Sequence, residues 1–75
     1  MIRQKVSLKN SKYDKDNDVL HVFFSDLSNT LAEEEYPGVY LDKNDYNEVV
    51  GMTLMDFKQR IRKIRQWLPQ YDFCI

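Results

Sequence analysis

The sequence predicts an α+β domain, in which an antiparallel β-meander of three to four strands carries one C-terminal helix packed on one face. Three observations favour this fold. Short apolar stretches alternate with clusters of turn-forming residues, a pattern typical of antiparallel strands joined by tight turns. One stretch near the C-terminus has helical rather than alternating periodicity. The chain has 75 residues, enough for a single domain over residues 1–75.

Alternation of apolar and polar residues, together with turn chemistry, places the strands. They are expected at about residues 4–13, 18–25, 31–43 and 48–55. Residues 15–18 and 43–47 are rich in Asp, Asn and Lys and predict turns, in which Asn47 can adopt a positive φ. Pro37-Gly38 interrupts the third range.

The helix is expected at about residues 57–68. Asp56 fits the N-cap position, and Gln59 fits the capping-box position three residues later. Pro69 ends the helix. Apolar residues at helical spacing would cover one face of the sheet and form the core with the second and last strands. The expected core residues are Leu20, Val22, Phe24, Val50, Met52, Leu54, Phe57, Ile61, Ile64 and Leu68.

The ends of the chain carry further expectations. The alternating tail Tyr71–Ile75 either folds back onto the body or forms an extended recognition segment. Cys74 is the only cysteine, and a lone thiol fits a reducing compartment. No stretch approaches the roughly 18 apolar residues of a membrane span, and Met1–Asn10 lacks a secretory apolar region. We therefore expect a cytoplasmic protein with no membrane partner, whose small core gains stability from self-association or from another chain.

A set of turn and strand residues follows an order shared with a known family. They are Tyr13-Asp14, Asp18, Leu20, Val22, Phe24, Gly38-Val39, Leu41-Asp42 and Val50-Gly51-Met52. Over about residues 12–58 the chain resembles the small bacterial and phage proteins of the domain of unknown function 2283 family. The resemblance implies a small β-sheet domain with a helix and no assigned catalytic residue. It also implies an antitoxin-like role, since members are sometimes found beside genes for small toxin-like proteins.

The sequence contains no recognisable catalytic or cofactor-binding pattern. His21 is the only histidine and has no identifiable partner for acid–base chemistry or metal binding. Cys74 has no activating neighbour. The two glycines, Gly38 and Gly51, cannot form a phosphate-binding loop. We therefore expect no enzyme activity, no cofactor and no dedicated metal site.

Two acidic turns leave one question open. Their carboxylates belong to Asp14, Asp16 and Asp18 in the first turn and to Asp42, Asp45 and Glu48 at the third. The spacing in the first turn opens a calcium loop, but the Gly and Glu that the loop needs further on are absent. In a meander the first and third turns share one end of the sheet, so the two groups could approach each other and bind a divalent cation. Solvated turns are the favoured interpretation, because turn chemistry alone explains these residues.

The sheet face opposite the helix is the first candidate surface for a partner. It would carry Val19, His21, Phe23, Tyr40, Val49, Gly51 and Thr53. An apolar face of this kind left in water usually marks an interface. We expect either a homodimer or another protein partner here; the alternative is that the N-terminal segment or the tail covers the face.

The basic helix is the second candidate surface. It carries Lys58, Arg60, Arg62, Lys63 and Arg65, followed by Trp67. Residues 1–55 have 6 Lys/Arg against 10 Asp/Glu, a net charge of −4, whereas residues 56–75 have 5 against 2, a net charge of +3. Either the basic face is solvated and balanced by Glu33, Glu34 and Glu35, or it docks nucleic acid or an acidic protein surface.

Two functional hypotheses follow. The leading one is a small non-catalytic protein-interaction module, for which an antitoxin-like or otherwise inhibitory role is the most concrete form. The alternative is a nucleic-acid-binding module that uses the basic helix, with Trp67 stacking on a base.

Overall fold

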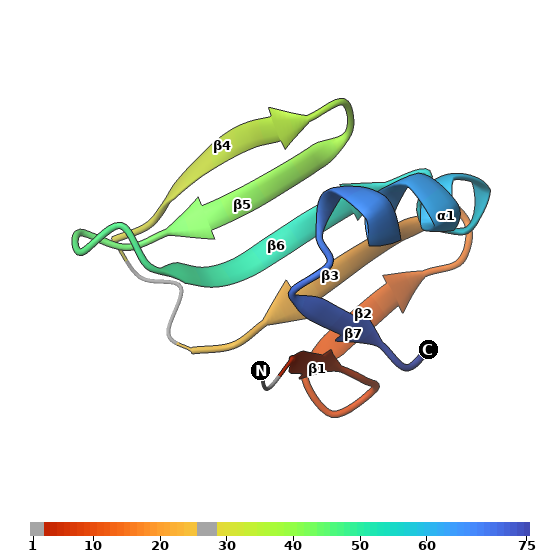
Figure 1. Cartoon of the computed structure of the whole chain (residues 1–75), viewed down its shortest axis with the longest axis horizontal. Coiled ribbons are helices and arrows are strands. Elements are labelled where there is room, and N and C mark those ends of the chain that lie inside the picture. Colours follow the sequence, from red (N-terminus) through yellow and green to blue (C-terminus); the bar gives the residue numbers. More distant parts are fainter. Residues whose placement is uncertain (1–2, 26–28) are drawn as a thin grey trace.

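A five-stranded antiparallel sheet and one helix dominate the computed structural model, which describes residues 3–25 and 29–75 (Figure 1). In chain order the elements are β1 (Gln4–Val6), β2 (Ser11–Asp14), β3 (Val19–Phe23), β4 (Leu31–Tyr36), β5 (Val39–Lys43), β6 (Val49–Met55), α1 (Phe57–Trp67) and β7 (Tyr71–Phe73). The large sheet has the order β2-β3-β6-β5-β4, and β1 pairs with β7 in parallel. The predicted α+β class is confirmed, but the sheet has five strands rather than three to four.

Two predicted strand ranges each contain a turn, but only the second turn adds a strand to the large sheet, because β1 pairs with β7 instead. The predicted range 4–13 contains both β1 and β2, because the backbone turns at Ser7–Asn10, where the Asn10 N–H donates to the Ser7 carbonyl at 3.2 Å. The range 31–43 contains β4 and β5, joined through Gly38 with φ of 77°. Glycine adopts this positive φ without the steric cost that a Cβ atom brings.

The sheet is also not a simple meander. After β3 the chain continues to β4 at the far edge of the sheet, and β6 then returns to lie between β3 and β5 (Figure 1). β6 has the longest apolar run of the strands and has buried residues at four of its seven positions. A central place suits such a strand, since both its edges are paired and both its faces are partly covered.

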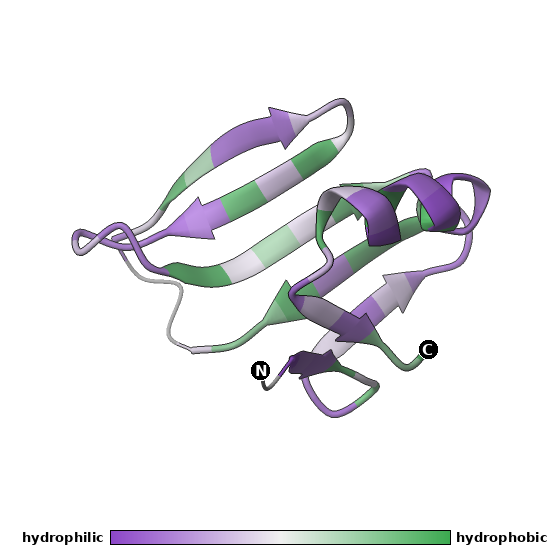
Figure 2. Ribbon diagram, viewed as in Figure 1, coloured by the Kyte–Doolittle hydropathy of each residue, from purple (hydrophilic) through white to green (hydrophobic). Residues whose placement is uncertain are grey.

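The core lies between the sheet and α1. Two cross-strand rows supply the sheet side: one joins Leu20, Leu54 and Val39, and the other joins Val22, Met52 and Leu41. The helix contributes Phe57, Ile64 and Leu68, which are buried, and Ile61, which is half-buried. Figure 2 shows the apolar bands along β3, β5 and β6. The predicted helix stripe and most core-facing sheet residues are therefore confirmed, but Val50 is buried without joining this core cluster.

Both ends of the chain pack on the helix side of the sheet. Val6 of β1 and Phe73 of β7 are buried in the same core as α1, and the Phe73 ring lies 5.9 Å from the Phe57 ring. The ring of Tyr71 stacks on Phe24 at 5.5 Å. The tail therefore folds back onto the body, the first of the two alternatives that the sequence allowed, and neither described end crosses to the opposite sheet face.

Candidate interaction surfaces

The sheet face opposite α1, here called the open sheet face, is lined by side chains from all five strands of the sheet. One cross-strand row runs across its whole width and consists of Lys12, His21, Thr53, Tyr40 and Glu34, one residue per strand from β2 to β4. The three middle members of the row are half-buried, while the two charged ends are exposed. The row therefore presents a half-buried centre between a cationic edge and an acidic edge.

Apolar exposure on the open sheet face is concentrated at Phe23, whose side chain is 43% exposed, and at Met55, which is 42% exposed. Val19 was expected to be available on this face, but it is buried at 8% exposure, flanked in register by Asp14 and Met55. Gly51 is buried as well, between Phe23 and Asp42. The face thus has a smaller apolar area than the sequence suggested, and its two exposed apolar residues, Phe23 and Met55, lie at opposite ends of the β3–β6 pair.

Tyr40 and its neighbours give the centre of this face a polar component. A hydrogen bond with Glu34 raises the pKa of the Tyr40 hydroxyl. His21 and Thr53 lie side by side in register. The prediction that Val49 belongs to this face is wrong, because Val49 packs against the core cluster next to a register shift between β5 and β6. This combination of half-buried polar groups around an exposed aromatic ring is typical of protein interfaces rather than of a hydrophobic core.

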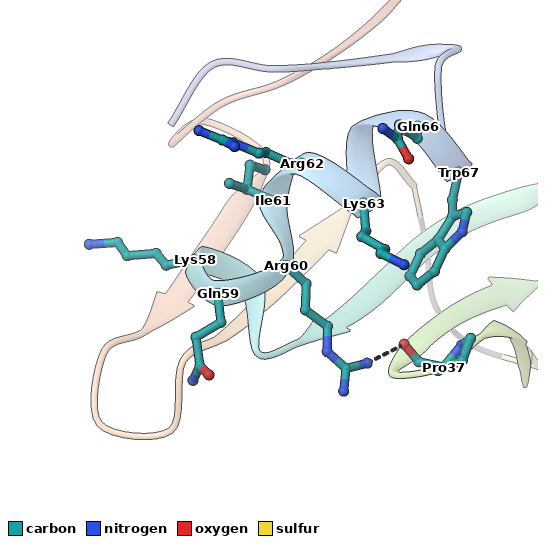
Figure 3. Close-up of a pocket in the computed structure, with 9 residues that line it drawn as sticks. All are labelled: Pro37, Lys58, Gln59, Arg60, Ile61, Arg62, Lys63, Gln66 and Trp67. Atoms are coloured by element: carbon teal, nitrogen blue, oxygen red, sulfur yellow. Dashed lines mark hydrogen bonds between the residues drawn. The ribbon is translucent and has the colours of Figure 1, made fainter.

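The basic helix does not form one continuous cationic face. Lys58, Arg62 and Arg65 recur at helical steps of four and three. Lys58 and Arg65 of this group line a groove with Tyr13 of β2 and Ile75 at the C-terminus. Arg60, Lys63 and Trp67 recur at steps of three and four on the other side, facing the β4–β5 turn. Figure 3 shows the second group directed towards Pro37 while Lys58 and Arg62 point away from it. The predicted single face is therefore divided into two flanks.

The flank that faces the β4–β5 turn is engaged within the chain. Arg60 donates a hydrogen bond from Nη1 to the Pro37 carbonyl at 2.9 Å. The Trp67 ring stacks on Tyr36 with a centroid distance of 5.0 Å and an interplanar angle of 2°. Trp67 thus anchors α1 to the hairpin. Its ring, which the sequence suggested could stack on a base, stacks on Tyr36.

The other flank is free of ion pairs with any described residue. Lys58, Arg62 and Arg65 are all exposed. The ammonium group of Lys58 lies 5.1 Å from the centre of the Tyr13 ring, a cation–π contact. These three cations, and Lys63 on the other flank, remain available to a ligand.

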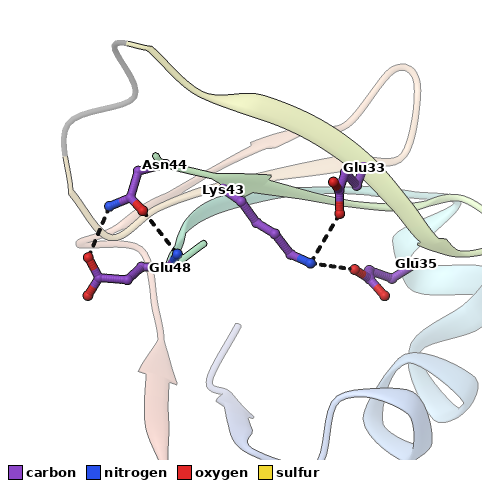
Figure 4. Close-up of polar contacts among 5 residues, drawn as sticks. All are labelled: Glu33, Glu35, Lys43, Asn44 and Glu48. Atoms are coloured by element: carbon purple, nitrogen blue, oxygen red, sulfur yellow. Dashed lines mark hydrogen bonds and ion pairs between the residues drawn. The ribbon is translucent and has the colours of Figure 1, made fainter. Parts of the chain in front are cut away.

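The glutamates of β4 do not balance the helix, contrary to one of the sequence alternatives. Glu33 and Glu35 both bind the ammonium group of Lys43 on β5, at 3.1 and 2.8 Å (Figure 4). These hydrogen bonds raise the pKa of Lys43. Two of these glutamates are therefore paired within the hairpin, because Lys43 lies on the neighbouring strand.

The two acidic turns lie at opposite ends of the sheet, so the expectation that they approach each other is wrong (Figure 1). Val19, directly after the first turn, pairs with Met55 at the end of β6, whereas Lys43, directly before the other turn, pairs with Val49 at its start. The insertion of β6 between β3 and β5 causes this separation. Among residues 3–25 and 29–75, no group of three or more His, Cys, Asp or Glu side chains is placed to hold a metal ion.

Within each turn the polar side chains bind the local backbone. Asp14 accepts hydrogen bonds from the backbone N–H of Asp16 at 3.1 Å and from the Asn17 side chain at 2.8 Å, and the second of these lowers the pKa of Asp14 most. In the second turn Asn44 binds Glu48 (Figure 4). Asn47 has φ of 62°, as its residue type predicted. Turn chemistry therefore accounts for Asp14, Asn44, Asn47 and Glu48.

Asp18 has a role that the sequence did not indicate. Its Oδ1 atom accepts hydrogen bonds from the Tyr13 hydroxyl at 2.6 Å and from the backbone N–H of Lys58 at 3.0 Å, and its carbonyl accepts from the Phe57 N–H at 2.9 Å. Asp18 thus caps the N-terminus of α1 from 40 residues away. The predicted cap, Asp56, has φ of 51° and makes no side-chain capping bond, because a capping residue needs extended backbone dihedrals.

The electrostatics of this cap follow from its hydrogen bonds. The Tyr13 hydroxyl, and then the Lys58 N–H, lower the pKa of the Asp18 carboxyl. The bond to Asp18 raises the pKa of Tyr13 to about 12. No pattern local to residues 15–18 or 56–59 could have revealed this contact, because it depends on the sheet bringing the β2–β3 turn beside the start of α1.

The fold and these surfaces define a small α+β protein with a one-sided sheet and no recognised catalytic constellation among its described residues. A family model for a protein of unknown function, DUF2283, matches residues 10–58, well over half of the chain. The chain belongs to this family, as the sequence resemblance indicated. No curated protein and no solved structure matches the chain. In the described part of the chain, α1 is too short and too polar to cross a membrane.

Proposed function

We propose that this protein is a non-catalytic interaction module that forms a homodimer through its open sheet face. The observation that carries the proposal is that α1 and both described chain ends pack on one side of the sheet, which leaves Phe23 exposed on the other. A chain of this size has a small core, and burial of a second apolar surface would add stability.

The charges at the ends of the open-face row support face-to-face pairing. Lys12 stands on β2 at one edge and Glu34 on β4 at the other. A twofold axis parallel to the strands would place Lys12 of each copy over Glu34 of its partner. Edge-to-edge pairing through β4 is less favourable, because its glutamates would repel the same residues of a second β4.

Sedimentation equilibrium tests the homodimer. We expect the wild-type chain to associate with increasing concentration and Phe23→Arg to remain monomeric, because the substitution places an unpaired charge within the interface. Tyr46→Arg is the matched control, since Tyr46 is 84% exposed in the turn between β5 and β6. Equal association of wild type and Phe23→Arg would reject the proposal.

Charge reversal at Lys12 and Glu34 provides a second test of the homodimer. Lys12→Glu and Glu34→Lys should each weaken the dimer, since each creates a like-charge contact across the axis, and the double variant should recover most of the wild-type affinity. Additive loss in the double variant would show that these residues do not face each other.

The biological form of this proposal is an antitoxin-like or otherwise inhibitory protein, for which the family resemblance is the support. We place it in the cytoplasm, where the exposed thiol of Cys74 would stay reduced.

The alternative function, nucleic-acid binding, rests on Lys58, Arg62 and Arg65 and is less well supported, because Trp67 already stacks on Tyr36. A gel shift with mixed DNA and RNA at low salt tests it, and binding should weaken steeply with added salt.

A further inference from the structure

A groove beside α1 combines an apolar lining with two cations. It has a volume of about 530 Å³, within the range of roughly 300–1,000 Å³ common for ligand sites. The lining residues are Leu8, Tyr13, Phe57, Ile61 and Ile75, with Lys58 and Arg65 as the charged members. This groove, here called the Leu8 groove, lies on the helix side of the molecule and is separate from the open sheet face.

The walls of the Leu8 groove expose large aliphatic side chains to water. Leu8 is 75% exposed and Ile75 is 46% exposed, although the sheet, helix and terminal strands bury most other residues of this type. Ile61 of α1 is half-buried beneath them. A ligand that inserts an apolar side chain between Leu8 and Ile75 would remove this surface from water, which is favourable.

The charge of the groove is not neutralised by its surroundings. None of the described lining residues is acidic. Neither Lys58 nor Arg65 forms an ion pair with a described residue, although Asp72 lines a neighbouring pocket with Arg65. The Asp18 carboxylate binds the Tyr13 hydroxyl and the backbone N–H of Lys58, so one negative charge touches the groove wall at Tyr13, but it forms no ion pair with the Lys58 ammonium group. The groove is therefore complementary to an apolar group accompanied by negative charge.

The chemistry of the lining favours a peptide over a nucleic acid. Stacked bases need open aromatic faces, but the Tyr13 ring is covered by the Lys58 ammonium group and Phe57 is only 4% exposed. The exposed walls are aliphatic and suit a Leu, Ile or Phe side chain. Two cations on one helix flank, Lys58 and Arg65, are placed to meet carboxylates on either side of it.

We propose that the Leu8 groove binds an acidic peptide segment of a partner protein, which inserts one large apolar side chain between Leu8 and Ile75 and places carboxylates beside Lys58 and Arg65. This site is independent of the homodimer, since it lies on the other side of the sheet. A dimer would then carry two such grooves, one on each outer side, and could hold two copies of the partner segment.

Selection from a random peptide library displayed on phage tests this proposal with the full chain. We expect enriched peptides with one Leu, Ile or Phe flanked by two or more Asp or Glu. Synthetic fluorescent copies should lose about 5- to 20-fold in affinity on Lys58→Glu, on Arg65→Glu and on Leu8→Ser. Leu8 and Lys58 are exposed, so these variants should fold normally, which circular dichroism checks.

Matched controls separate this site from general charge and from the dimer. Lys63→Glu reverses an exposed charge on the other flank of α1, and Leu31→Ser removes a side chain that is also 75% exposed but lies on β4. Both variants, and Phe23→Arg, should bind the peptides within about twofold of wild type. If Phe23→Arg changes neither the association nor the peptide binding, the homodimer is rejected and the groove proposal stands.

Three results would overturn the groove proposal. One is the absence of any enriched peptide, or enrichment without carboxylates. Another is peptide affinity that is unchanged in Lys58→Glu and Leu8→Ser. The third is displacement of the bound peptide by a 12-nucleotide single-stranded DNA or by phosphatidylserine vesicles at lower concentration than by unlabelled peptide, which would assign the groove to a phosphate ligand.

Discussion

The side chain of Asp18 connects the first hairpin to the helix. It holds the Tyr13 hydroxyl at 2.6 Å and the Lys58 N–H at 3.0 Å with the same oxygen atom. The first peptide N–H groups of a helix have no partner within it, and a carboxylate at this end also interacts favourably with the helix dipole. Asp18 therefore supplies from a distant turn what a local N-cap supplies in most helices.

Replacement of Asp18 should lower the thermal stability measurably. We expect Asp18→Ala to reduce the melting temperature by roughly 4–8 °C, the usual effect of losing one helix cap in a domain of this size. Asp16→Ala is the control, because Asp16 lies in the same turn and is exposed. Thermal unfolding followed by circular dichroism gives both values, and an equal effect of the two substitutions would contradict the capping role.

The carboxyl groups of Asp14 and Asp18 predict how the stability of the fold falls at acid pH. The pKa values of Asp14 and Asp18 are lowered in the folded chain from the ordinary value of 3.8. A lowered folded pKa contributes stability that is fully present above the unfolded pKa and is lost as pH falls through the folded pKa. We expect denaturant midpoints to be constant from pH 6 to about pH 5 and to fall below about pH 4. In Asp18→Asn this fall should be shallower.

At the scale of elements, α1 is tied to the β4–β5 hairpin at its hairpin-facing flank. Trp67 stacks on Tyr36 near the end of the helix, and Arg60 binds the Pro37 carbonyl near its beginning. Arg60 also lies 3.8 Å from the Asp56 carboxylate. The hairpin is held to the core by the pairing of β5 with β6 and by buried Val39 and Leu41, and these contacts add a second attachment through α1.

Removal of the Tyr36 ring should loosen this attachment without unfolding the domain. We expect Tyr36→Ala to cost about 0.5–1.5 kcal/mol, the usual contribution of an aromatic pair, and to shift the fluorescence of Trp67 to longer wavelength. Trp67 is the only tryptophan, so its emission reports this contact alone. Tyr46→Ala, at an exposed turn, is the control, and an unchanged spectrum in Tyr36→Ala would contradict the stacked arrangement.

At the scale of the whole molecule, stability depends on one layer of apolar side chains between the sheet and the helix. Sheet, helix and terminal strands all contribute to this layer, and the chain has no disulfide because Cys74 is its only cysteine. A single core of this size rarely supplies more than about 3–5 kcal/mol. The loss of one fully buried side chain should therefore be close to the limit that the fold tolerates.

Two isoleucines of α1 test this expectation. Ile64 is fully buried, whereas Ile61 is half-buried at the edge of the core. Ile64→Ala should cost about 2–5 kcal/mol and leave much of the chain unfolded at 25 °C, while Ile61→Ala should cost clearly less. Urea unfolding followed by circular dichroism measures both, and equal midpoints would contradict the position of the core.

The sequence by itself determined the features that depend on local periodicity and turn chemistry. The helix stripe, Leu20 and Val22 of β3, Met52 and Leu54 of β6, the turn at Asn47 and the family were all predictable, because each depends on residues a few positions apart. The start of β6 was not, because a register shift beside it turns Val49 towards the core. The exposed position of Phe23 also followed from strand alternation. These features place the open sheet face without any structure.

Only the tertiary structure decided which distant segments meet. The order of the strands set the two acidic turns apart and brought Asp18 to the start of α1. It also divided the basic helix into two flanks, because Tyr36 and Pro37 occupy one side, and it formed the Leu8 groove from three separate parts of the chain. The physical reason is that strand pairing through backbone hydrogen bonds is nearly independent of side-chain identity, so the choice of neighbours depends on packing of the whole core.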